Sequence, residues 1–497
     1  MARPIAATAM VLALAAPAAA QEEHHDHPAP ERLGAVHFAT SCVPAVGAAF
    51  NRAVALLHSF AYTAADKGFA EVAAHDPVCA MAHWGRGMSH YHQLWDPPAG
   101  DELAAGAAEI GKAAAMPAVT PRERALIAAL GLYYADAAHT APVTRALRYS
   151  NAMAGVARQN PGDDEVSVFY ALSLVATASP ADRTHERQKR AAEILEPIWK
   201  RQPGHPGAPH YLIHAYDSAE LAERGLPAAR AYAQIAPSAP HALHMPSHIF
   251  TRLGLWDDSI ASNLAARAAA RAQGDVGEEL HAMDYLTYAY LQRGRTADAA
   301  QVVASLQRMG ALAADGFKIG YAGNAMPARL AVESRDWAAA ARLQPLPGSA
   351  PQVAAIVWWA RALGRLRTAT PGPADTDMAQ LQACRDALRA SGDTYWVAQV
   401  DALLKSFKGW RAAAAGDSRL AVSDLTAAAD EEDALEKLPV TPGPIVPARE
   451  QLGELFLQLN RPKDALGAFN AALALAPGRR GALQGATEAT RQLATSH

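Results

Sequence analysis

Histidines are concentrated in two short segments near the middle of this 497-residue chain. The first segment, PHYLIHAYD (209–217), holds two histidines and an aspartate, and the second, PHALHMPSHIF (240–250), holds three histidines. Neighbouring histidines within each segment are three or four residues apart, which places their side chains on one face of an α-helix. Two imidazoles at this spacing can share a transition-metal ion, and a ligand from an adjacent helix can complete the set. The pattern predicts a metal centre, provided that neighbouring helices carry these residues.

The C-terminal part of the chain indicates how such helices are arranged. Small and large residues recur there at fixed intervals, followed by a proline: Leu452, Gly453, Phe456, Ala465, Phe469, Ala472 and Pro477. They fall on positions 7, 8, 11, 20, 24, 27 and 32 of the tetratricopeptide (TPR) repeat. Small residues let paired helices approach, and large residues fill the space between them. The pattern predicts an all-α fold, a TPR-type α-solenoid in which helix-turn-helix repeats form a right-handed superhelix.

The same repeat frame reaches the histidine-rich segments. Pro203 and Pro237 are one repeat length apart, and both fall on position 32, so that new repeats begin three residues after each. Counting back from Gly294 as position 15 begins another repeat at Leu280. Pro246 lies inside the second histidine segment and should kink its helix, because proline lacks a backbone N–H.

The resemblance to TPR proteins implies which residues face the concave groove, because positions 2, 5, 9, 12 and 13 of the first helix of each repeat line it. Nine polar residues of three successive repeats fall on such positions: His210, His214, Asp217, His241, His244, His248, His281, Asp284 and Tyr288. We expect the six histidines and Asp284 to bind metal. Asp217 and Tyr288 are candidate catalytic groups, together with Glu165, which falls on position 2 of an earlier repeat.

The identity of the metal is left open between zinc, copper and iron. Bound zinc would favour a hydrolytic reaction, and copper or iron an oxidation, on a small or peptide-like substrate. Two alternatives remain: a TPR scaffold that binds a protein or peptide without catalysis, and a periplasmic metal-handling protein. The expected partners are a small-molecule or peptide ligand in the groove, or a protein.

Longer phrases resemble a more specific group of proteins. TSCVPAVGAAFNRAVALLHSF, DPVCAMAHWG, HYLIHAYD, APHALHMPSHIFTRLGLWD and HAMDYLTYAYLQ are similar to exported bacterial TPR-repeat proteins, a largely uncharacterised group. The resemblance covers nearly the whole mature chain and implies the α-solenoid fold, but no established reaction. His83 stands where that group is expected to have tyrosine, which argues against His83 as an essential ligand.

The order of segments suggests an exported protein. Residues 1–20 read as a signal peptide cleaved after Ala20, followed by a polar, disordered tail at 21–32. We expect an N-terminal TPR-like array with the histidine site at 33–365 and C-terminal TPR repeats at 366–497. The mature protein would be periplasmic or secreted, where Cys42 and Cys79 either form a disulfide or remain buried thiols.

Composition and missing motifs exclude several other functions. The formal charge of −4 gives no support for a general attraction to nucleic acid or anionic membranes. After the first segment, no apolar run is long enough to span a bilayer. The sequence contains no phosphate-binding glycine loop, no GxSxG elbow and no HExxH helix.

Overall fold

The computed structural model describes residues 31–94, 97–117, 119–312, 314, 316–368 and 374–495. Within these ranges every regular element is a helix, and the predicted all-α class is confirmed. The signal peptide expected at 1–20 and residues 21–30 of the tail expected at 21–32 lie outside the described residues. Residues Arg32–His497 group into one compact unit. The division expected near residue 365 stays a prediction.

The elements are listed here in chain order. They are η1 (Pro44–Val46), α1 (Gly47–His58), α2 (Tyr62–His75), α3 (Ala80–Ser89), α4 (Gly100–Ala115), α5 (Pro121–Tyr134), α6 (Pro142–Gln159), α7 (Asp164–Ala176), α8 (Glu186–Arg201), α9 (Gly207–Tyr216), α10 (Ala222–Ile235), α11 (Pro240–His244), α12 (Pro246–Arg252), α13 (Trp256–Gln273), α14 (Val276–Gln292), α15 (Thr296–Leu306), η2 (Gln307–Met309), α16 (Phe317–Glu333), α17 (Trp337–Ala340), α18 (Pro351–Arg367), α19 (Asp375–Ala390), α20 (Thr394–Ala414), α21 (Ser418–Asp433), α22 (Ala448–Gln458), α23 (Pro462–Leu475) and α24 (Arg480–Thr495).

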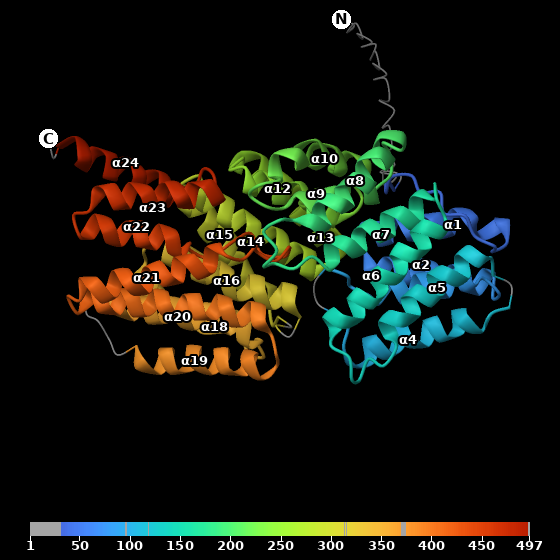
Figure 1. Ribbon diagram of the computed structural model, residues 1–497, viewed down its shortest axis with the longest axis horizontal. Coiled ribbons are helices and arrows are strands. Elements are labelled where there is room, and N and C mark those ends of the chain that lie inside the picture. The colour runs from blue at the N-terminus through green and yellow to red at the C-terminus, as the bar shows by residue number, and fades with distance from the viewer. Residues whose placement is uncertain are drawn as a thin grey trace, which may run out of the picture. The chain divides into compact units, whose positions relative to one another are not determined.

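Helices that follow one another in the chain pack as hairpins, and each hairpin packs on the next (Figure 1). In the middle of the chain these hairpins are α9 with α10, α11 and α12 with α13, and α14 with α15. Their first helices also touch one another, α9 against α12 and α11 against α14. This is the TPR-type α-solenoid that the sequence predicts. It brings the four helices that carry the clustered histidines, α9, α11, α12 and α14, together.

Small residues permit this close packing at the positions that the repeat pattern predicts. A Cβ added to Gly453 on α22 would lie 2.7 Å from the ring of Phe469 on α23. Ala465 and Ala472 on α23 are fully or almost fully buried. A larger side chain at Gly453 would force the two helices apart, which explains the glycine.

Cys42 and Cys79 are joined by a disulfide, one of the two alternatives that the sequence left open. The bond ties the segment before η1 to the residue that precedes α3. Cys384 on α19 is a half-buried free thiol.

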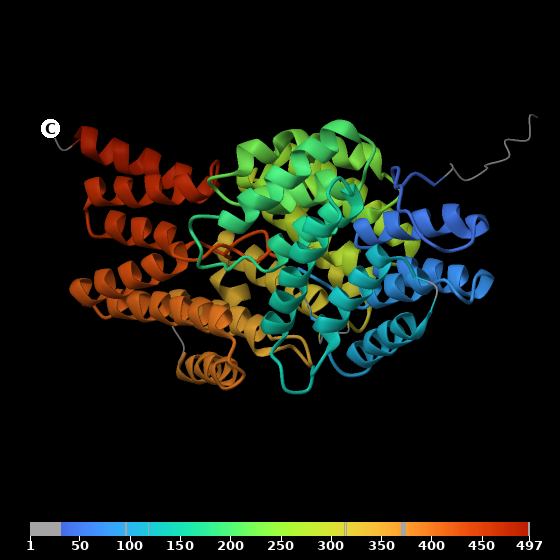
Figure 2. The same ribbon diagram turned by 45° about the vertical axis from the view of Figure 1, so that its right-hand side comes forward.

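The connection between α21 and α22, residues 434–447, passes over the first helices of the central hairpins (Figures 1 and 2). We call it the crossing segment. Lys437 contacts Asp217 at the end of α9, the Thr441 carbonyl accepts a hydrogen bond from Tyr285 on α14, and Arg329 on α16 donates to the carbonyls of Gly443 and Pro444. The crossing segment therefore covers the helices that carry the histidines.

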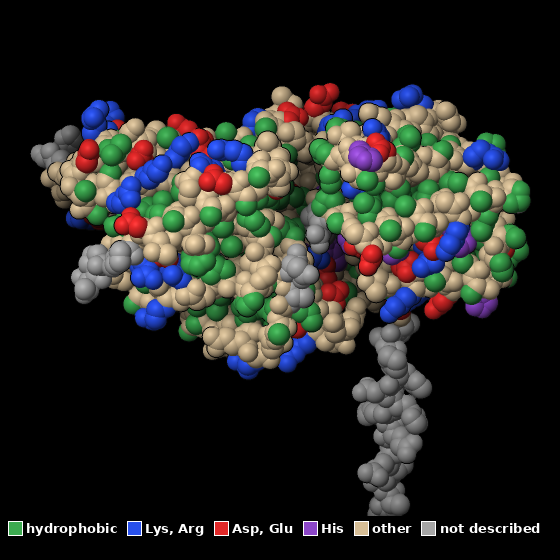
Figure 3. Space-filling model, turned by 90° about the horizontal axis from the view of Figure 1, so that it is seen from below, with side chains coloured by type: hydrophobic (Ala, Val, Ile, Leu, Met, Phe, Trp, Pro, Cys, Tyr) green, Lys and Arg blue, Asp and Glu red, His purple; other side chains and the backbone are tan. Residues whose placement is uncertain are grey.

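No helix of the described ranges combines the length and apolarity that a bilayer crossing requires. On the face seen in Figure 3, lysines and arginines are interspersed with acidic side chains.

Candidate metal centre

Helix α9 carries His210 and His214 one turn apart, as their spacing predicts. The Nδ1 atom of His210 lies 2.6 Å from the backbone carbonyl of His58 at the end of α1. Because that carbonyl only accepts, Nδ1 must carry the proton. The Nε2 atoms of His210 and His214 lie 3.1 Å apart.

The second histidine segment forms two short helices instead of one. Helix α11 ends at His244 and α12 begins at Pro246, so the helix is interrupted at the proline where the sequence predicts a kink. Met245 between them keeps helical dihedral angles. His244 and His248 therefore still share a face, and their Nε2 atoms lie 3.0 Å apart.

Helix α14 supplies the sixth histidine, His281, and a tyrosine that packs against the histidines. The His281 ring lies 4.1 Å from the His244 ring, measured between centroids. Tyr285, one turn further along α14, packs against His244, His248 and His281.

The six histidines form two groups of possible metal ligands. One ring nitrogen of each of His210, His214 and His241 lies within 4.8 Å of the others, and the same holds for His244, His248 and His281. We call these the first and the second triad. The two triads are adjacent, because the His214 and His248 rings are 5.8 Å apart. All six residues are at most 6% exposed.

In the second triad, side chains outside the triad fix the protons of two rings. Nδ1 of His248 lies 2.9 Å from Oδ2 of Asp217, and Nδ1 of His244 lies 2.6 Å from Oδ1 of Asn263. The Asn263 amide nitrogen donates to the Ser259 carbonyl, so its oxygen is the acceptor. Both Nδ1 atoms therefore carry the proton. A neutral imidazole has only one, so the two facing Nε2 atoms carry lone pairs.

The first triad has a similar support. Nδ1 of His241 lies 3.2 Å from Glu278, whose carboxylate is also paired with Lys318 at 2.6 Å. Carboxylates and carbonyls in such positions orient ligating imidazoles in known metal sites.

Electrostatics favour the neutral form of five of these histidines and the ionised form of Asp217. Burial lowers the pKa of His210, His214, His244 and His281 well below the ordinary value, and the neighbouring imidazoles lower it further. Burial also lowers the pKa of His248 to about 4, although Asp217 opposes the shift. Burial alone would raise the pKa of Asp217, but Lys437 and Arg252 outweigh it and hold that pKa well below its usual range.

Glu165 belongs to a different cluster, in which both ring nitrogens of each histidine have a hydrogen-bond partner. Its carboxylate lies between Nε2 of His58 at 3.0 Å and Nε2 of His205 at 3.2 Å. The Tyr211 hydroxyl lies 2.9 Å from Nδ1 of His58, and the Ala208 N–H donates to Nδ1 of His205. Each Nε2 can thus donate to Glu165 and each Nδ1 can accept. This cluster has the geometry of a satisfied structural network, and Glu165 lies outside both triads.

Asp284 and Tyr288 also lie outside the triads. The Asp284 carboxylate is 3.9 Å from Nε of Arg329, and burial raises its pKa to about 6. The Tyr288 hydroxyl lies 3.1 Å from Arg479, and its ring packs edge-on against Trp256. Of the three candidate catalytic residues, only Asp217 contacts a histidine of the two triads, His248.

Several contacting residues escaped the sequence analysis. Tyr285 and Glu278 share a face of α14 with His281, at four and three residues' distance, so helical spacing could have identified them. Asn263 on α13 and Lys437 in the crossing segment come from other parts of the chain, and no local pattern indicates them.

No family model matches the chain, and no curated protein matches it. Several solved structures resemble it distantly. A human IFIT1 dimer with m7Gppp-AAAA has 11% sequence identity and a TM-score of 0.39, and the match covers 84% of this chain and 90% of that chain. The Cut9–Hcn1 complex of the APC/C has 12% identity and a TM-score of 0.40 (89% of this chain, 76% of that chain), and yeast Tom70 has 10% identity and a TM-score of 0.32 (90% and 88%). At this distance they carry nothing about activity or ligands.

Proposed function

We propose that this protein is a helical-repeat metal-binding protein whose two histidine triads hold transition-metal ions, one in each triad. The observation that carries the proposal is the pair of Nε2 atoms of His244 and His248. They are 3.0 Å apart, and Asn263 and Asp217 hold both protons on the far side of the rings. Two lone pairs at this distance repel each other unless a cation lies between them.

A metal ion suits this place better than a proton. Protonating one ring would create a buried imidazolium, which burial disfavours. Two nitrogens bound tetrahedrally to one zinc ion are about 3.3 Å apart, given Zn–N bonds of about 2.0–2.1 Å. The observed 3.0 Å and 3.1 Å separations are close to this value.

The metal would add chemistry that the side chains lack. Three imidazoles leave a coordination position for an exogenous ligand, as in hydrolytic and oxidative metal enzymes. Asp217, Asn263 and Glu278 would orient the imidazoles. Hydrolysis and oxidation by zinc, copper or iron are the reaction classes that we propose, in a periplasmic or secreted protein.

The crossing segment argues against the scaffold alternative at this place. A peptide that docked on the histidines would have to displace Lys437 and Thr441, which already contact Asp217 and Tyr285. We therefore place any peptide-binding role elsewhere on the molecule.

Elemental analysis of the untagged protein tests the proposal. We expect close to two equivalents of one transition metal, and about one equivalent in His214→Ala and in His281→Ala, each of which opens one triad. His139→Ala, at an exposed histidine, is the matched control and should retain both.

A second measurement keeps the test valid if a variant misfolds. The chelated wild-type protein titrated with Co²⁺ should develop the visible absorption of tetrahedral cobalt with nitrogen ligands. A folded wild-type protein that is isolated without metal and gives no such absorption overturns the proposal.

A further inference from the structure

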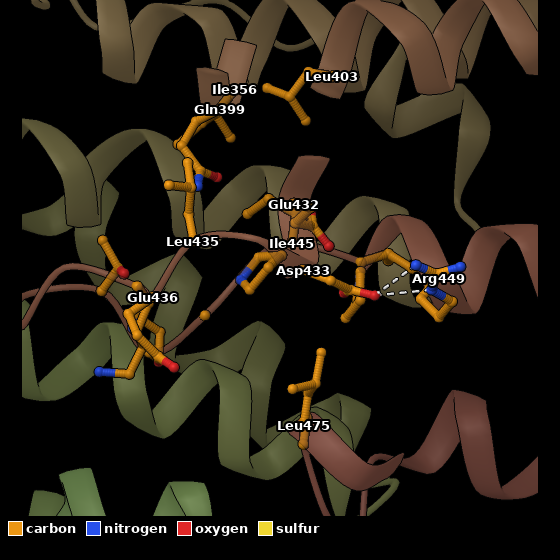
Figure 4. Close-up of a pocket in the computed structure, with 18 of the residues that line it drawn as sticks. Ile356, Gln399, Leu403, Glu432, Asp433, Leu435, Glu436, Ile445, Arg449 and Leu475 are labelled. Atoms are coloured by element: carbon orange, nitrogen blue, oxygen red, sulfur yellow. Dashed lines mark hydrogen bonds and ion pairs between the residues drawn. The ribbon is translucent and has the colours of Figure 1, made fainter. Parts of the chain in front are cut away.

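A cavity of about 160 Å³ borders the crossing segment. Its walls come from α12, α14, α16, α18, α20, α21, α22, α23 and the crossing segment itself. Figure 4 shows Ile356, Gln399 and Leu403 on one side, Leu475 on the opposite side and Glu432 between them. Aromatic side chains make up much of the remaining wall: Tyr321, Trp359, Tyr395 and Trp396.

The cationic side chains of this wall are already matched by carboxylates. Arg449 pairs with Asp433 at 2.8 Å, and Arg252 pairs with Glu436 at 3.2 Å. Lys437, which also lines the cavity, pairs with Asp217 at 2.6 Å. An anionic ligand would therefore have to break existing ion pairs.

Glu432 is the exception among the carboxyl groups of the wall. It forms no ion pair with any side chain of the described ranges, whereas Asp433 and Glu436 both do. Its Oε1 atom accepts a hydrogen bond of 2.8 Å from the backbone N–H of Ala448, the first residue of α22. Burial raises its pKa to about 8, because an ionised carboxylate without a paired cation is unfavourable in this place. The cavity thus contains one acidic group that lacks a counter-ion.

We propose that this cavity binds a small organic ammonium ion, with Glu432 as its counter-ion and the aromatic side chains around its apolar part. Tryptophan and tyrosine rings attract cations through their π-faces, which adds to the carboxylate charge. Arg252 and Lys437 line the cavity and also pair with Asp217 beside the second triad. The ammonium proposal does not rest on a bound metal, so either proposal can fail without the other.

The cavity volume limits the ligand. A protein cavity of about 150 Å³ accommodates benzene, so the ligand would have one ring or a short alkyl chain beside its ammonium group. Benzylamine has this size and charge, and benzyl alcohol has the same shape without the charge. The pair separates charge recognition from simple filling of an apolar space.

Calorimetric titration of the full chain with both compounds tests the proposal. We expect benzylamine to bind at least 10-fold more tightly than benzyl alcohol. In Glu432→Gln, benzylamine should lose at least 10-fold in affinity and benzyl alcohol less than 3-fold, because glutamine keeps the hydrogen bond to Ala448. Glu431→Gln is the matched control: this neighbouring carboxylate pairs with Lys405 outside the cavity and should not matter.

A proton balance gives an independent readout. Near neutral pH the ammonium ion should displace the proton of Glu432, so the heat of binding will differ between buffers with different ionisation enthalpies. Glu432→Gln should abolish this difference without changing the metal content. Equal affinity for the two compounds, or unchanged benzylamine binding in a folded Glu432→Gln protein, overturns the proposal.

Discussion

Asp217 at the end of α9 accepts a hydrogen bond of 2.9 Å from Nδ1 of His248 on α12. The same carboxylate is held by Arg252 at 2.8 Å and by Lys437 at 2.6 Å. One buried side chain therefore connects two successive repeats, the second triad and the crossing segment. Because it fixes the proton of His248 on Nδ1, it also directs Nε2 of that ring towards His244.

Replacing Asp217 by asparagine should weaken metal binding in the second triad. The amide removes the charge that makes His248 a stronger ligand, and changes of this kind cost about 10- to 100-fold in metal affinity. It also leaves Lys437 and Arg252 without their buried anion, so the free energy of unfolding should fall by about 3–5 kcal/mol. Competition with a chromogenic chelator measures the affinity, and denaturant titration measures the stability.

Asp257→Asn is the control for this substitution. Asp257 pairs with Arg293 at 2.9 Å on the surface, where an ion pair contributes about 0–1 kcal/mol. Metal affinity should be unchanged in this variant. If Asp217→Asn binds zinc as tightly as the wild-type protein, Asp217 does not support a metal ligand.

Local repetition made the six histidines predictable from the sequence. Prolines and glycines fixed the repeat frame, and that frame placed the histidines on the first helices of three successive hairpins, where the structure has them. The frame was less accurate on α14, which begins at Val276 and not at Leu280. It selected Tyr288, whereas Tyr285 is the tyrosine that contacts the triad.

The contacts around the histidines could not be predicted in this way. Lys437 is 220 residues from Asp217 in the sequence, and Arg329 is 115 residues from Pro444. The proline-rich stretch 438–447 reads as a loop, but nothing in its composition says where the loop lies. Its position depends on how the whole unit packs, which periodicity within one repeat does not encode.

Gly453→Ala tests the helix packing. The new methyl group would lie 2.7 Å from the Phe469 ring, so α22 and α23 must shift apart. We expect a loss of about 1–3 kcal/mol in the free energy of unfolding. Gly467→Ala is the control, because this exposed glycine of α23 has no atom within 4 Å of the added carbon. It should stabilise the protein by about 0.5–1 kcal/mol. Equal effects of the two variants would contradict the packing.

Removing the disulfide should destabilise the N-terminal hairpins. Cys42 and Cys79 enclose a loop of 37 residues, and closing a loop of this size stabilises a protein by about 2–4 kcal/mol. We expect the double variant Cys42→Ser, Cys79→Ser to melt at a lower temperature than the oxidised protein, and a reductant to leave its Tm unchanged. Cys384→Ser should retain the reductant-sensitive Tm. A wild-type Tm that does not respond to reduction would show that the bond does not stabilise the fold.

Glu432 should make stability depend on pH. Its pKa is raised from 4.5 in the unfolded chain to about 8 in the fold, so between these values the folded protein holds a proton that the unfolded chain has released. Stability from this group is therefore fully present below pH 4.5 and is lost as the pH rises through the folded pKa, with a slope of at most about 1.4 kcal/mol per pH unit.

Nearby Asp433 adds to the raised pKa, while Arg479 and Arg449 oppose it. Because glutamine does not titrate, the stability of Glu432→Gln relative to wild type should increase from about pH 5 to about pH 8. Denaturant titrations of both proteins across this range measure the difference, and parallel pH profiles would show that Glu432 is ionised in the fold.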